Sequence, residues 1–221
     1  LSHFPQLAEC QDGPRRANAL IAGALTEMFS YDRDRLLAAD RMLVEAGEIA
    51  SSARIYAWRC LVRQIMYVER TDAAHPQLMS EVDEFSRKAL ELSKANPLVL
   101  SLVGLARVMV EQNADAGSIL ARDAVALSPY NAHAHLAHAV ALSRAGDDTG
   151  ALDAARRGAE IAARTAHVHW WEAASGLVAI RCGNFAAAIA HYEAAHYRAP
   201  GFRAAMRHLL FLYLWAGERE K

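Results

Sequence analysis

The stretch GNFAAAIAHYEAAHYRAP, residues 183–200, decides the fold of this chain. It starts with a Gly-Asn turn pair, continues through alanine-rich residues that favour helix, and ends at Pro200, which cannot continue a helix. Related segments begin at Gly146 and at Gly117, and the second of these also runs to a proline, Pro129. A helix that recurs with the same start and stop signals indicates an array of similar units.

Small residues in these segments recur at a nearly constant interval. Aligning Ala89, Ala124, Gly158 and Ala195 gives spacings of 35, 34 and 37 residues. Periods in this range are typical of solenoids in which each repeat is a pair of helices. No segment of β-branched or aromatic residues alternates with a period of two, so the sequence predicts an all-α fold without a sheet.

Turn signals and apolar spacing divide the chain into predicted helices joined by short turns. We expect Asp32 or Asp34 to cap the second helix, and Pro76 suits a first helical turn. The predicted helices span residues 14–29, 32–50, 52–70, 76–94, 97–112, 115–128, 131–145, 148–163, 168–182, 185–198 and 202–216.

The repeated segment resembles the tetratricopeptide repeat (TPR) family, whose period is 34 residues. The family pattern A-x3-F-x2-A-x4-P is matched by Ala188, Tyr192, Ala195 and Pro200. The small residue in the middle of each first helix is matched by Gly104, Ala139 and Gly176, and the turn glycine by Gly146, Gly183 and Gly217. The resemblance implies a right-handed α-solenoid of antiparallel helix pairs.

This resemblance is good over residues 97–217 and weak before them. We therefore expect two regions. Residues 1–95 would form divergent helix pairs or an N-terminal helical cap. Residues 96–221 would form a TPR-like array whose final helix either caps it or has been cut from a longer one.

In TPR arrays the first helix of each pair lines a concave groove. By resemblance, the groove residues here are His133, Leu136, Val140 and Arg144, then Trp170, Leu177 and Arg181, and finally Arg207, Phe211 and Trp215. The result would be a mostly apolar floor with Arg144 and Arg181 along one edge. Such a strip suits an amphipathic helix or an extended peptide with a carboxylate, because arginine binds carboxylates through two parallel hydrogen bonds.

Some TPR proteins hold the C-terminal carboxylate of a chaperone in a Lys/Asn clamp. The corresponding positions here are Leu105, Val140, Leu177 and Phe211, so the clamp is absent and chaperone tails are disfavoured as partners.

Composition argues against several other classes of protein. The formal net charge is −1 and neither half has a basic excess, which disfavours direct contact with nucleic acid. No apolar run approaches the length of a membrane span, so no membrane partner is expected. Three widely spaced cysteines indicate a reducing compartment, and we expect a cytoplasmic protein.

The sequence contains no convincing catalytic or metal-binding motif. His135 and His138 lie three residues apart, whereas helical metal pairs are usually four apart, and neither a cysteine nor a carboxylate close in sequence completes a site. Nucleophile elbows and phosphate-binding glycine loops are absent too. We expect no enzyme, no metal and no cofactor.

The leading hypothesis is a protein–protein interaction scaffold. The chain has 21 Arg against 3 Lys and begins with Leu1, which fits a regulatory module of a larger bacterial protein such as a transcription regulator. The partner would be another protein or a segment of its own parent chain. Two alternatives stay open: a small-molecule-sensing helical-repeat domain, and homo-oligomer formation through residues 202–215.

Overall fold

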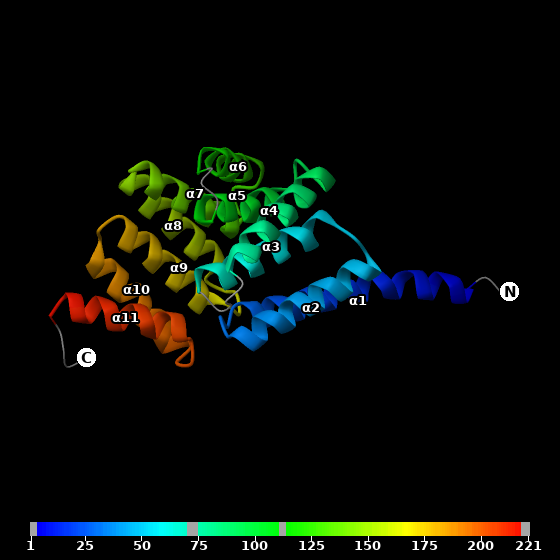
Figure 1. Cartoon of the computed structure of the whole chain (residues 1–221), viewed down its shortest axis with the longest axis horizontal. Helices are drawn as coiled ribbons and strands as arrows, with labels where there is room; N and C mark the ends of the chain where they lie inside the picture. The colour runs from blue at the N-terminus through cyan, green and yellow to red at the C-terminus, as the bar shows by residue number, and fades with distance from the viewer. Residues whose placement is uncertain (1–3, 70–74, 111–113, 218–221) are drawn as a thin grey trace. The chain divides into compact units, whose positions relative to one another are not determined.

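The computed structural model describes the backbone of residues 4–69, 75–110 and 114–217, and within these ranges every regular element is an α-helix (Figure 1). The helices form antiparallel pairs, as the sequence predicts. The chain divides into two compact units, Leu1–Lys94 and Ala95–Lys221. Each unit is described by itself below.

The first unit contains four described helices, namely α1 (Phe4–Met28), α2 (Arg33–Ile49), α3 (Ala53–Val68) and α4 (His75–Leu92). Helix α1 packs along α2, α2 contacts α3, and α3 packs along α4. The largest fully buried side chains of this unit include Met28, Leu36, Leu43, Leu61 and Ile65. The core therefore lies between successive helices, as in stacked helix pairs.

The second unit contains α5 (Pro97–Met109), α6 (Ala114–Leu127), α7 (Ala132–Ala145), α8 (Asp148–Ala162), α9 (Val168–Arg181), α10 (Phe185–Arg198) and α11 (Arg203–Trp215). Three pairs are formed by α5 with α6, α7 with α8 and α9 with α10, and α11 packs on α10. First helices also contact one another, α5 with α7 and α7 with α9. This stacking continues the hydrophobic core from one pair to the next.

Several of these helices have an N-terminal residue whose side chain caps the first turn. Asp32 caps α2 by accepting hydrogen bonds from the backbone N–H groups of Asp34 and Arg35 at 3.0 and 3.2 Å. Asn131 caps α7 in the same way, and Asp147 caps α8 by accepting from the Gly150 N–H at 2.9 Å. Each cap satisfies backbone donors that the first helical turn leaves unpaired.

The three predicted turn glycines adopt a backbone conformation that favours glycine. Gly146, Gly183 and Gly217 have φ of 83°, 69° and 77°, a left-handed conformation that residues with a Cβ rarely adopt.

Small residues allow close approach within the pairs of the second unit. A Cβ added at Gly104 would lie 3.1 Å from the backbone oxygen of Gly117 and 3.1 Å from the backbone nitrogen of Ala121 on α6. A Cβ at Gly176 would lie 2.7 Å from the ring of Tyr192 on α10. The resemblance assigned these mid-helix positions to small residues, and the packing gives the physical reason.

One helix boundary was predicted wrongly. Helix α1 starts at Phe4, ten residues before the expected start at 14. In the structure Pro14 lies within α1, so the helix continues on the N-terminal side of this proline. Proline there removes one backbone N–H donor without ending the helix.

Candidate functional site

The predicted groove residues of α7 differ in their exposure. Leu136 and Val140 are buried, His133 is half-buried, and only Arg144 is exposed. The His133 ring packs against two indoles of α9, with its centroid 5.9 Å from that of Trp170 and 4.9 Å from that of Trp171. Burial lowers the pKa of His133 to about 4. The imidazole is therefore neutral at neutral pH and acts here as an aromatic packing group.

Exposure of the predicted residues increases from α7 to α11. On α9, Trp170 is buried, Leu177 is half-buried and Arg181 is exposed. On α11, Arg207, Phe211 and Trp215 are all exposed. The Trp215 ring lies against Phe185 of α10, with 4.2 Å between the ring centroids. The apolar surface open to a partner is thus on α11, whereas the corresponding part of α7 is closed.

Arg144 and Arg181 lie in the last turns of α7 and α9, two neighbouring first helices. Burial lowers the pKa of Arg181, and the positive charge of Arg144 lowers it further. Among the described residues, no carboxylate lies within ion-pair distance of either group. Two positive charges on neighbouring helices, with no counter-ion among the described residues, form a surface on which an anionic group would relieve their repulsion.

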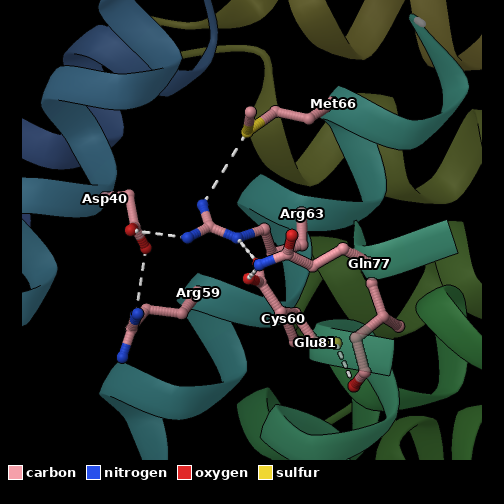
Figure 2. Close-up of polar contacts among 8 residues, drawn as sticks. Asp40, Arg59, Cys60, Arg63, Met66, Gln77 and Glu81 are labelled. Carbon is pink, nitrogen blue, oxygen red and sulfur yellow. Dashed lines mark hydrogen bonds and ion pairs between the residues drawn. The ribbon is translucent and has the colours of Figure 1, made fainter. Parts of the chain in front are cut away.

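A charged cluster that sequence analysis missed lies between helices of the first unit. Figure 2 shows Asp40 of α2 between two arginines of α3. Asp40 Oδ1 accepts from Arg59 Nε at 3.0 Å, and Asp40 Oδ2 accepts from Arg63 Nη2 at 2.8 Å. Arg63 Nε also donates to Glu81 of α4, and the Arg59 guanidinium lies 4.2 Å from the centroid of the Phe85 ring.

This cluster links three helices through largely buried charges. The side chains of Asp40 and Arg63 are only 13% and 12% exposed. Burial alone would lower the pKa of Arg63, but the carboxylates of Asp40 and Glu81 outweigh it and raise that pKa. The only sequence signal was the pair Arg59 and Arg63, four residues apart on a largely apolar helix.

A small cavity of about 240 Å³ lies between α2 and α3 beside this cluster. Arg59 is one of its lining residues, together with Leu43, Val44, Gly47, Glu48, Ser51, Ser52, Ile55 and Tyr56. Its volume is below the ~300 Å³ at which pockets for drug-sized ligands begin.

Two further kinds of site are absent from the described part of the chain. Over those residues, no three His, Cys, Asp or Glu side chains come together as metal ligands. Nor does any described helix combine the length and apolarity that a bilayer span requires.

Comparison with solved structures identifies the fold. The structure matches TTC0263, a thermophilic TPR protein of Thermus thermophilus, with a TM-score of 0.63 at 13% sequence identity, over 90% of this chain and 99% of that one. This chain has a TPR fold. A TPR protein of Parabacteroides merdae matches with a TM-score of 0.49 at 13% identity, over 92% of this chain and 75% of that one. YrrB, described as a TPR protein with an unusual peptide-binding site, matches with a TM-score of 0.46 at 18% identity, over 94% and 97%.

At the level of sequence, no family model and no curated protein matches this chain. The likeness to solved structures therefore shows the fold alone.

Proposed function

We propose that the second unit binds a peptide or helix carrying an acidic group, through Arg144, Arg181 and the exposed apolar residues of α11. The observation that carries this proposal is the placement of two arginines in the last turns of two contacting first helices, with no carboxylate of the described residues within ion-pair distance of either. Arginine presents a planar fork of donors that matches a carboxylate, and its positive charge persists at any physiological pH.

The arginines stand on neighbouring first helices, so one partner segment crossing those helices reaches both. Phe211 and Trp215 offer apolar surface farther along the array, and Arg207 adds a third positive charge on α11. Aromatic and arginine side chains are the types that dominate binding energy in protein interfaces. A partner with an acidic group and apolar anchors therefore suits this surface.

The predicted groove residues have two roles in this proposal. Arg144, Leu177, Arg181, Arg207, Phe211 and Trp215 contact the partner. His133, Leu136, Val140 and Trp170, which are wholly or largely buried, hold α7 and α9 in place beneath it. The proposal needs no catalytic group and no cofactor.

The scaffold would act as a regulatory module of a larger protein, such as a bacterial transcription regulator. The bound segment would then come from another protein or from the parent chain itself. Nucleic-acid contacts would be made by another part of that protein, because this chain has a net charge of −1.

A second candidate function, sensing of a small anionic molecule, is favoured by the cavity of about 240 Å³ beside Arg59. Asp40 and Phe85 already hold this guanidinium in place. A small carboxylate that raised the melting temperature of the wild type but not of Arg59→Gln would support this alternative.

The main proposal is tested by selecting peptides from a random library on the wild-type chain and measuring their affinity by fluorescence anisotropy. We expect the selected peptides to carry Asp or Glu, and Arg144→Glu/Arg181→Glu to weaken their binding by about 10- to 100-fold, since hydrogen bonds to charged groups contribute about 1.5–3 kcal/mol.

The matched control is Arg157→Glu/Arg198→Glu, which makes the same charge change at two exposed positions on second helices. Binding should survive in this control. Failure to select any peptide would contradict the proposal, as would equal losses in the two double variants.

A further inference from the structure

Helix α11 exposes a large apolar surface. Met206 is 49% exposed, Leu210 63%, Phe211 61%, Leu214 58% and Trp215 62%. Met206, Leu210 and Leu214 are spaced four residues apart, so they form one stripe along the helix. The stripe lies about 100° around the helix from Phe211 and Trp215. Apolar residues gathered in this way on one face usually mark an interaction surface.

Leu210 is a large residue at a repeat position where the preceding helix pairs have a small one. The repeat aligns Phe211 with Leu177, Val140 and Leu105, and one residue earlier it aligns Leu210 with Gly176, Ala139 and Gly104. At Gly104 and Gly176 an added Cβ would lie within 3.1 and 2.7 Å of atoms in the second helix of the pair. The small residue is therefore what permits the close approach of a second helix.

A leucine at this position changes how closely another helix can pack on this face of α11. A second helix seated as α6 sits on α5, or α10 on α9, would collide with the Leu210 side chain. A leucine stripe instead suits a helix at the ordinary interaxial distance of about 8–10 Å, where side chains interdigitate. The face is thus built for a different kind of helix contact from the one inside each pair.

We propose that this face binds α11 of a second copy of the chain, antiparallel, with Leu210 at the two-fold axis. The stripe is symmetric about Leu210 in an antiparallel pair, because Met206 of each copy faces Leu214 of the other and Leu210 faces Leu210. A two-fold interface requires this kind of self-complementarity.

Charge complementarity also favours the antiparallel arrangement. Arg203 and Arg207 lie in the N-terminal half of α11 and are exposed. In the dimer they would face the C-terminal half of the other α11, where the helix dipole is negative and the Trp215 ring is available for a cation–π contact.

The available area is adequate for a dimer. The five exposed apolar side chains offer on the order of 600 Å² per copy, and the stems of Arg203 and Arg207 extend this towards the ~800 Å² per partner of a standard interface. Because the peptide surface proposed above includes Arg207, Phe211 and Trp215, dimer formation and peptide binding would compete for α11.

The first test is the mass of the purified chain in solution, measured by light scattering from low to high micromolar concentration. We expect twice the 24.2 kDa of one chain for the wild type. Leu210→Glu should be monomeric over the same range. The control Ile119→Glu, at a 50% exposed position on α6, should remain dimeric. Circular dichroism should show the same helicity for all three.

The second test locates the two-fold axis. Leu210→Cys should cross-link to itself under mild oxidation, and Ile119→Cys, which carries the same native cysteines, should not. A monomeric wild type at all concentrations would overturn the proposal and leave the face to a helix from another protein or from the parent chain. A Leu210→Glu dimer, or equal cross-linking of both cysteine variants, would overturn it as well.

Discussion

The two units of the chain hold their helix pairs together by different means. In the first unit, buried charges connect α2, α3 and α4 through Asp40, Arg59, Arg63 and Glu81. In the second, glycines let first and second helices approach closely and an aromatic ring fills the adjoining space, as Gly176 and Tyr192 show. Helix pairing therefore does not depend on the TPR signature residues, which mark only one way of packing such pairs.

The largest effect in this comparison is expected from Asp40→Ala. It leaves Arg59 and Arg63 without their shared carboxylate in a largely buried place, which should lower the free energy of unfolding by about 3 kcal/mol. Urea denaturation measures this. The control Glu91→Ala removes the partner of Arg87 from an exposed ion pair and should change stability hardly at all. Equal stability of the two variants would mean that the buried cluster does not hold the first unit together.

Acid should destabilise the second unit through His133. Its folded-state pKa of about 4 is below the usual 6.5, so the unfolded state takes up a proton first as the pH falls. The stability that His133 contributes is full above pH 6.5 and is lost as the pH drops towards 4, by at most about 3 kcal/mol. Urea denaturation at a series of pH values measures this. Replacing the imidazole in His133→Phe should make the pH dependence shallower over that window, and an unchanged slope would contradict the assignment.

A smaller effect is expected from Gly176→Ala. The new methyl group would lie 2.7 Å from the ring of Tyr192, which is almost fully buried and has little room to move. Overpacking of this kind costs about 1–3 kcal/mol, seen as a lower melting temperature. Gly201→Ala is the matched control, since no atom lies within 4 Å of its added Cβ. Similar melting temperatures for both variants would remove close approach as the reason for the small residue.

The periodic part of the fold could be predicted from the sequence. Ten of the eleven described helices lie within a few residues of their expected boundaries, because capping residues and turn glycines act locally. The exception is α1, which starts at Phe4 and not at the expected residue 14 and runs through Pro14. The charged cluster could not be predicted, because Asp40 and Glu81 lie about 20 residues from the arginines they bind and no periodic pattern connects them.

The exposure of the predicted groove residues could not be read from the sequence. The resemblance assigned first-helix residues to a groove, but it could not show which of them neighbouring helices cover. The structure buries Leu136, Val140 and Trp170 and leaves Arg144, Arg181 and the α11 residues exposed. The exposure of a residue depends on the packing of side chains from several helices, so the repeat pattern alone does not predict it.

The most direct test of the central proposal is a double-mutant cycle between the arginines and the acidic group of a selected peptide. Affinities would be measured by calorimetry for the wild type and for Arg144→Gln/Arg181→Gln, each with the peptide and with the same peptide carrying Asn or Gln in place of its Asp or Glu. We predict a coupling free energy of more than about 1 kcal/mol that decreases as salt is added, since the arginines would contact the carboxylate directly. Independent, additive losses would contradict recognition of an acidic partner at Arg144 and Arg181.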